Sequence, residues 1–194
     1  MPSGVVHDRI TIWLLPWVVG LTYCLTRSAE LTLILSCGYL FSGMMFGPDL
    51  DIRSIQYKRW GVIRGIWLPY RKFLRHRSVL SHGFILGTCV RLAYLGAVIA
   101  AFGIVGVAIA QLCFGFAWNW QDFAREQFEV LLHKYPQETS ALFIGLEIGA
   151  MSHSISDWIG SRHQKRLKRK SKSRLKRKPK AKKPRTVRIY SNKK

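Results

Sequence analysis

Acidic side chains are scarce in this chain of 194 residues, which has ten Asp or Glu against 31 Lys or Arg and a net charge of +21. From residue 161 to the end there are 18 basic residues and no acid at all. Residues 1–160 are therefore nearly balanced, with 13 basic and ten acidic side chains. Because 48% of all residues are hydrophobic, the composition describes neither a soluble domain nor a disordered chain. It describes an apolar body, residues 1–160, followed by a basic tail, residues 161–194.

Cysteine is also sparse, and none of it is arranged for chemistry. Four cysteines each lie inside an apolar run, and no two are spaced as a chelating pair: Cys24, Cys37, Cys89 and Cys113. This spacing argues against a disulfide framework and against a zinc site built from thiolates. We expect the four thiols to behave as small core or lipid-facing groups.

Charge is absent from long stretches of the body. Four apolar segments follow one another, at residues 10–25, 31–46, 81–118 and 141–159. Residues 92–110 contain no charged side chain, and about 20 such residues span the hydrocarbon core of a bilayer. The first two segments are shorter and taken alone also fit buried helices. Their crowding beside the third predicts an all-α, polytopic membrane helix bundle of about four spans.

The loops between these segments predict an orientation. Residues 52–77 hold eight Lys or Arg and no acid, whereas residues 118–140 hold two basic and four acidic side chains. Basic loops stay on the cytoplasmic side, so we expect the 52–77 loop, the tail and both termini inside a bacterial inner membrane. No small-x-small cleavage site follows the first segment, which predicts an uncleaved helix. Tyr and Trp interleave the basic residues of the 52–77 loop, as suits the lipid headgroup region.

Histidines and aspartates gather at the ends of the apolar segments. Four of the ten carboxylates fall in short pieces that also hold four of the six histidines: His7 with Asp8, Asp49 with Asp51, His76 with His82, and His153 with Asp157. Imidazole nitrogen and carboxylate oxygen form the ligand set of divalent transition metals. The predicted topology places every piece on the cytoplasmic face at one depth. The sequence therefore predicts a single site there.

The last piece has the clearest geometry. His153 and Asp157 are four residues apart and share one face of a helix. Ala141, Gly145 and Gly149 continue the same row, and small residues at this spacing let helices approach closely in a membrane. We expect this helix to pack inward along the row. The alternative is a simple His–Asp hydrogen bond at a helix end.

The other pieces leave more than one interpretation open. Gly47 and Pro48 end a helix, so Asp49 and Asp51 lie in a turn, where one carboxylate binds metal and the other orients a histidine, or both serve turn chemistry. His76 fits the turn before a helix that Ser78 caps, with His82 in its first turns.

His7, the two remaining histidines and one acid are weighed separately. His7 stands near the terminus, where the alternative is an exposed interfacial histidine. His133 and His163 lie in polar surroundings, and we exclude them. Glu147, a costly group in a membrane span, lies off the face of His153, and we leave it outside the ligand set.

Four motifs in order carry a resemblance to a known family. They are His-Asp-Arg at 7–9, Phe-Gly-Pro-Asp-Leu-Asp at 46–51, His-Arg-Ser-x-x-Ser-His-Gly at 76–83 and His-x-x-x-Asp-Trp at 153–158. Across residues 1–160 the chain resembles a bacterial family of uncharacterised metal-binding integral membrane proteins. More distantly it is similar to membrane-bound metal-dependent hydrolases. The first resemblance implies metal binding, and the second implies hydrolysis.

These observations predict a divalent metal site at the cytoplasmic helix ends. The ion is Zn²⁺, with Mn²⁺ or Fe²⁺ as alternatives, and its candidate ligands are His7, Asp49, Asp51, His76, His82, His153 and Asp157. Asp51 or Asp157 is the candidate catalytic base for a phosphoester or lipid-type substrate. The alternative is a non-catalytic protein in which the ion clamps the helix ends or is handled as cargo.

The basic tail is assigned separately from the site. Residues 162–188, rich in Lys and Arg with Ser and Pro, are expected to be disordered. Such a segment binds anionic lipid or nucleic acid with affinity that falls as salt rises. The alternative role is a topology determinant that holds the inner leaflet.

Overall fold

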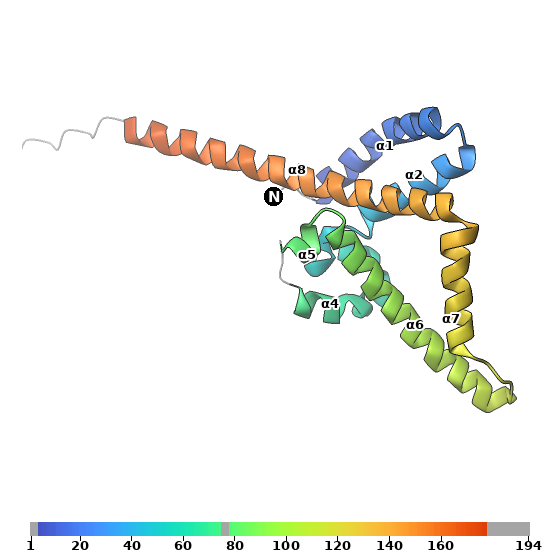
Figure 1. The fold of residues 1–194 in the computed structure, drawn as a ribbon. Helices are drawn as coiled ribbons and strands as arrows, with labels where there is room; N and C mark the ends of the chain where they lie inside the picture. Colours follow the sequence, from blue (N-terminus) through green and yellow to red (C-terminus); the bar gives the residue numbers. More distant parts are fainter. Residues whose placement is uncertain (1–3, 75–77, 178–194) are drawn as a thin grey trace, which may run out of the picture.

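The structure, a computed structural model, describes residues 4–74 and 78–177, and these form helices without any strand. Four helices are long: α1 (Gly4–Thr26), α2 (Ala29–Met44), α6 (Leu86–Phe114) and α8 (Pro136–Arg177) (Figure 1). Shorter elements connect them: η1 (Pro48–Asp51), α3 (Ile55–Arg59), η2 (Gly61–Ile66), α4 (Trp67–Phe73), α5 (Val79–His82), α7 (Trp120–Glu129) and η3 (Val130–Lys134). The all-α prediction is confirmed for the described part of the chain.

Three helical segments are long and apolar enough to cross a membrane: Gly4–Thr26, Ala29–Asp51 and Leu86–Phe114. They correspond to three of the four predicted spans and indicate membrane association. The fourth, residues 141–159, forms the first half of α8 and is not among them. Its hydropathy is lowered by Glu147, His153 and Asp157, the side chains that build or adjoin the candidate site.

Glycine allows α2 and α8 to pack closely. A Cβ atom added to Gly145 would lie 2.2 Å from the Leu35 carbonyl oxygen, and one added to Gly149 would lie 2.4 Å from that of Tyr39. Helix α1 packs on the same α2 helix. The expectation that α8 packs along its small-residue row is thus confirmed, and that row ends in His153.

Residues 52–74, the described part of the basic and aromatic loop, pack against the end of α2. Their core joins the buried side chains Phe46, Leu50, Tyr57, Trp67, Tyr70 and Leu146. The Trp60 indole donates a hydrogen bond to the Met45 carbonyl oxygen at 2.9 Å, which ties the segment to the chain just after α2. This packing holds η1, and with it Asp49, in a fixed place.

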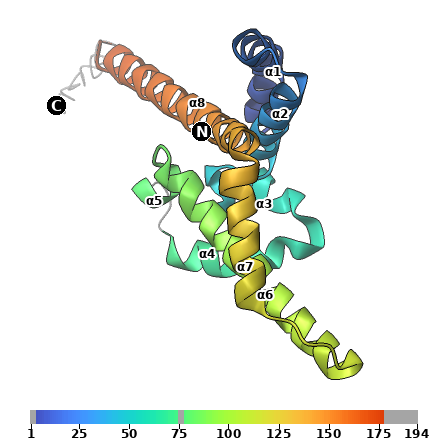
Figure 2. The ribbon, with the colours of Figure 1, turned by 45° about the vertical axis from the view of Figure 1, so that its right-hand side comes forward.

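Helix α6 runs away from the other long helices, and α7 leads the chain back to α8 (Figures 1 and 2). No residue of the apolar window of α6 is buried. Helix α7 is amphipathic.

Helix α8 does not end where the apolar body ends. We expected disorder from residue 162, but the helix continues to Arg177. Lys, Arg and Leu are good helix formers, and neither Gly nor Pro interrupts residues 161–177, so the helix propagates into the basic segment. Residues 178–194 lie outside the described part of the chain.

Candidate metal centre

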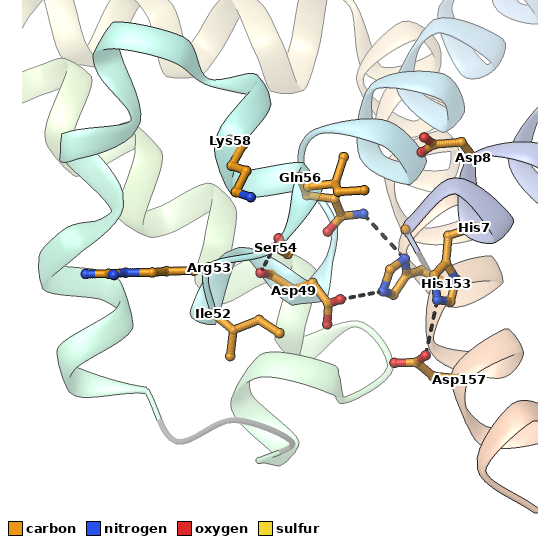
Figure 3. Close-up of a pocket in the computed structure, with 12 residues that line it drawn as sticks. His7, Asp8, Asp49, Ile52, Arg53, Ser54, Gln56, Lys58, His153 and Asp157 are labelled. Atoms are coloured by element: carbon orange, nitrogen blue, oxygen red, sulfur yellow. Dashed lines mark hydrogen bonds and ion pairs between the residues drawn. The ribbon is translucent and has the colours of Figure 1, made fainter. Parts of the chain in front are cut away.

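Five of the seven predicted ligands lie in two adjoining groups, contributed by four separate segments; Figure 3 shows four of them, His7, Asp49, His153 and Asp157. They are His7 from the first turns of α1, Asp49 from η1, His82 from the end of α5, and His153 and Asp157 from α8. Their ligand atoms form two groups, one of His7, His153 and Asp157 and one of Asp49, His82 and Asp157, and within each group these atoms lie within 4.8 Å of one another. Asp157 belongs to both groups and joins them.

The ring nitrogens face carboxylate oxygens across the cluster. His7 Nε2 lies 3.2 Å from Asp157 Oδ1, and His153 Nε2 lies 3.1 Å from Asp49 Oδ2. The imidazole rings of these two histidines are stacked, with centroids 3.9 Å apart. His82 Nε2 is more distant, 3.8 Å from Asp49 Oδ1. The cluster is largely shielded from solvent, since His7, His153 and Asp157 are each 4–6% exposed.

Two serines orient two of the histidines. The Ser156 hydroxyl donates to the His153 carbonyl oxygen at 2.8 Å and lies 2.7 Å from His7 Nδ1. Because this hydroxyl donates its proton to the carbonyl, with an ion bound its oxygen would accept a hydrogen bond from Nδ1, and the lone pair of His7 Nε2 would face the ion. Ser81 Oγ lies 2.8 Å from His82 Nδ1 in the same manner.

Gln56 approaches the third histidine. Its Nε2 donates to the Gly43 carbonyl oxygen at 3.0 Å and lies 3.5 Å from His153 Nδ1. A Cβ atom added to Gly47 would lie 2.4 Å from the same amide nitrogen. Glycine at position 47 therefore makes room for the side chain that lies beside His153.

The remaining candidates lie elsewhere. Asp51 is buried, and its charge acts on Tyr70 and Arg91 rather than joining either ligand group. His76 lies outside the described residues. His133 is well exposed and pairs with Glu129 at 3.4 Å, which agrees with its exclusion. The side chain of His163 also lies outside the described part.

A cavity of about 250 Å³ opens onto the cluster. His7, Asp49, His153 and Asp157 line one side, and Arg53, Ser54, Gln56 and Lys58 are among the residues that line the rest. Figure 3 shows Lys58 on the same wall as Gln56, while Arg53 extends away from the histidines.

The charges around this cavity are not all balanced. Asp8 pairs with Arg59 through distances of 2.9 and 2.5 Å, and this hydrogen bonding raises the pKa of Arg59 against the opposing effect of burial. Asp8 is thus a partner of Arg59 and not of His7. Arg53 and Lys58, in contrast, have no ion-pair partner among the residues that the structure describes. The cavity wall carries two uncompensated cations.

Several residues at this site had no clear signal in the sequence. Gln56, Ser156 and Lys58 come from a basic loop or a helix face, and nothing in their local pattern marks them. Only the spacing of Ser156, three residues after His153, places it near the predicted face.

The residues present fit a divalent ion. The cluster offers three imidazole nitrogens and two carboxylates, the donor set of Zn²⁺, Fe²⁺ and Mn²⁺. Asp49 Oδ1 is buried and accepts no hydrogen bond from any described residue, and a buried acceptor left in this way is costly. An ion held between Asp49 and the histidines would give it a partner.

Fold and cluster together define a helical protein with three helices able to cross a membrane and a candidate metal centre at their ends. The chain belongs to a family described as uncharacterised metal-binding proteins (DUF2227), whose family model matches residues 2–167. It is 41% identical over 59 residues to an uncharacterised protein of Aquifex aeolicus (strain VF5), a match that covers 30% of this chain and 41% of that relative. No solved structure matches the chain significantly.

Proposed function

We propose that the protein is a metal-dependent hydrolase of phosphoester or lipid-type substrates, with its centre at the cytoplasmic surface of the bacterial inner membrane. The observation that carries this proposal is the cavity itself, which has a His/Asp cluster on one side and, on the other, two cations that form no ion pair with any described residue. His7, Asp49, His82, His153 and Asp157 would hold the ion, with Zn²⁺ as the expected metal. Such an ion supplies Lewis-acid chemistry, because it polarises a phosphoryl oxygen and favours ionisation of water.

The protein groups divide the remaining work. Asp157 is a member of both ligand groups and lies 3.2 Å from His7, so it is better placed than Asp51 to accept a proton at the site. The stacked rings of His7 and His153 close one side against solvent. Burial of this kind strengthens electrostatic interactions with a bound anion.

Lys58 and Arg53 indicate the class of substrate. A divalent ion with two carboxylate ligands is formally neutral, so the two cations leave the cavity positive. A phosphate group matches this charge, and Lys binds phosphate as a point charge. The phosphate of a lipid headgroup and that of a soluble monoester share this chemistry.

Metal content and turnover test the proposal together. Purified full-length protein is analysed for bound metal and for phosphate release from p-nitrophenyl phosphate and from phosphatidic acid in mixed micelles. We expect His153→Ala and His82→Ala to lose most of the metal and the activity, while His133→Ala, on an exposed histidine, retains both. Full metal content in both cluster variants would overturn the site assignment.

A non-catalytic role is the second candidate, and one observation favours it. The ligands come from four segments, so an ion would clamp α1, η1, α5 and α8 together, and a fully occupied shell is typical of structural sites. If the ion has only this structural role, removing it with a chelator is expected to lower the melting temperature strongly. The metal-loaded protein would release no phosphate from either substrate. Phosphate release by the metal-loaded protein, but not by the metal-free protein, would exclude a purely structural role.

The basic tail is a separate part of the proposal. Residues 162–188 are proposed to contact anionic lipid or nucleic acid electrostatically. Support comes from composition, since this stretch has no acid. Truncation after residue 160 is expected to abolish low-salt binding of a fluorescent RNA oligonucleotide or of phosphatidylglycerol nanodiscs while the metal content stays unchanged. Binding that survives truncation would end this assignment.

A further inference from the structure

Two buried side chains of opposite charge lie beside the metal centre and belong to neither ligand group. Glu147 of α8 is 7% exposed and Arg91 of α6 is 1% exposed. The two side chains interact electrostatically, and both line a small cavity with Ser81 and His82. Taking two charges out of water is costly even when they are paired, so the pair calls for a role.

Glu147 holds a strained turn. Its Oε1 accepts a hydrogen bond from the Ile85 backbone N–H at 3.0 Å. Ile85 has φ of +61° and ψ of −55°, and Leu86 N donates to the Phe84 carbonyl oxygen at 2.6 Å, which makes Ile85 the centre of a γ-turn. This conformation is rare and strained, above all for a β-branched residue, so it persists only where its surroundings enforce it.

Arg91 anchors the chain on the other side of His82, at Ser81. Its guanidinium donates to the Ser81 carbonyl oxygen at 2.9 Å and to Thr88 Oγ1 at 2.8 Å. Ser81 is fully buried, and its hydroxyl lies 2.8 Å from His82 Nδ1. Arg91 therefore fixes the backbone of the residue whose side chain orients His82.

His82 is the ligand whose position depends most on this turn. It ends the four-residue helix α5, and only Gly83 separates it from the strained turn centred on Ile85. Its Nε2 is 3.8 Å from Asp49, compared with 3.1 Å between His153 and Asp49. The two anchors act on either side of it, Arg91 at position 81 and Glu147 at position 85.

We propose that Glu147 and Arg91 are positioning residues for His82, which together hold the chain at positions 81 and 85 so that this imidazole faces the metal centre. The proposal rests on the metal site proposed above. It gives the buried charge pair a role that neither ligand group supplies, and it predicts that metal affinity depends on residues that never touch the ion.

Metal affinity separates this role from a general effect on folding. Full-length protein in detergent is titrated with Zn²⁺ against a fluorescent chelator, and with Co²⁺ to follow its visible absorption. We expect Glu147→Leu to weaken Zn²⁺ binding about 10–100-fold, the range found for residues that orient ligands, and to change the Co²⁺ spectrum. Glu147→Gln keeps the acceptor for Ile85 N–H and is expected to stay within about threefold of the parent protein. Glu138→Leu, in the first turn of α8, is the matched control.

A double variant keeps the outcomes distinct. In a His82→Ala background, Glu147→Leu should weaken Zn²⁺ binding no further, because the ligand it positions is already absent. An equal loss in both backgrounds would overturn the positioning role and assign Glu147 to general stability. If His82→Ala itself binds Zn²⁺ like the parent protein, the proposed site fails, and not merely its positioning. Should Glu147→Leu fail to fold, Arg91→Lys is compared in the same two backgrounds with the same expectation.

Discussion

At the scale of single residues, serine hydroxyls decide which histidine nitrogen faces the cluster. Ser156 donates to the His153 carbonyl oxygen and therefore accepts from His7 Nδ1. With an ion bound, the ring would be held in the tautomer whose unprotonated Nε2 faces the cluster beside Asp157. Partners of this kind fix both ring orientation and ligand basicity in metal sites.

Removal of this hydroxyl should weaken metal binding without removing a ligand. We expect Ser156→Ala to lower Zn²⁺ affinity about tenfold, measured by competition with a chelator. Ser140→Ala, which removes an exposed hydroxyl from the same helix, should leave the affinity unchanged. Equal affinity in both variants would show that Ser156 does not orient His7.

Lys58 carries the prediction about substrate class. It lines the cavity without an ion-pair partner among the described residues. We expect Lys58→Gln to raise the inhibition constant of inorganic phosphate about tenfold, a loss of roughly 1.4 kcal/mol, with Zn²⁺ content unchanged. Lys72→Gln, on the exposed side of α4, is the control. A phosphate effect of similar size in both variants would point to nonspecific charge.

At the scale of helices, the close approach of α2 and α8 sets the geometry of the centre. Gly149 lies one turn before His153, and a Cβ atom there would also lie 2.9 Å from the Gly43 backbone nitrogen. Both neighbours are backbone atoms of α2, which cannot move aside for a methyl group as the end of a flexible side chain could. The helices would have to separate near the site.

Gly149→Ala is therefore expected to destabilise the protein by about 1–3 kcal/mol. For a chain of this length, each kcal/mol lowers the melting temperature by about 2–4 °C. Thermal unfolding in detergent measures the change. Gly103→Ala on α6, where nothing lies within 4 Å, should cause no loss because alanine favours helix over glycine. A melting temperature of Gly149→Ala equal to that of the control would contradict the close-packing account.

The elements that were predictable are those with a repeating local signal. Apolar runs marked α1, α2, α6 and the first half of α8, and the row ending at Gly149 marked the packed face. The strained turn at Ile85 had no such signal, because its conformation depends on Glu147, which lies 62 residues away. The helical continuation to Arg177 was not predicted, because the high net charge of this stretch favours disorder whereas its Lys, Arg and Leu residues favour helix.

At the scale of the whole molecule, the predicted topology is what placed the candidate ligands together. Segment ends on one membrane face would lie at one depth, so pieces far apart in sequence were expected to meet there. Topology does not resolve which of two neighbouring carboxylates turns inward. Asp49 and Asp51 differ only in rotation about η1, and the packing of the 52–74 segment against Phe46 and Leu50 decides between them.

The orientation of the chain is the last prediction. It depends on whether residues 141–159 of α8 cross the membrane, because the two cases place the C-terminus on opposite sides. Three helices are apolar enough to cross a membrane, and an odd number of crossings would place the C-terminus outside. The convergence of His7, Asp49, His82 and His153 instead favours four crossings, because α8 must return to the face where α1 begins. Glu147, His153 and Asp157 lower the hydropathy of residues 141–159, but they are buried within the protein, which is compatible with a crossing.

Reporter fusions in bacteria distinguish these accounts. We expect green fluorescent protein fused after Lys194 to fluoresce, since it folds only in the cytoplasm, and alkaline phosphatase fused after residue 118 to be active, since it requires the outer side. The matched fusion is phosphatase after residue 53, in the basic loop, which should be inactive. An active phosphatase after Lys194 would show that residues 141–159 do not cross. The C-terminal basic segment would then be removed from the face that carries the metal centre.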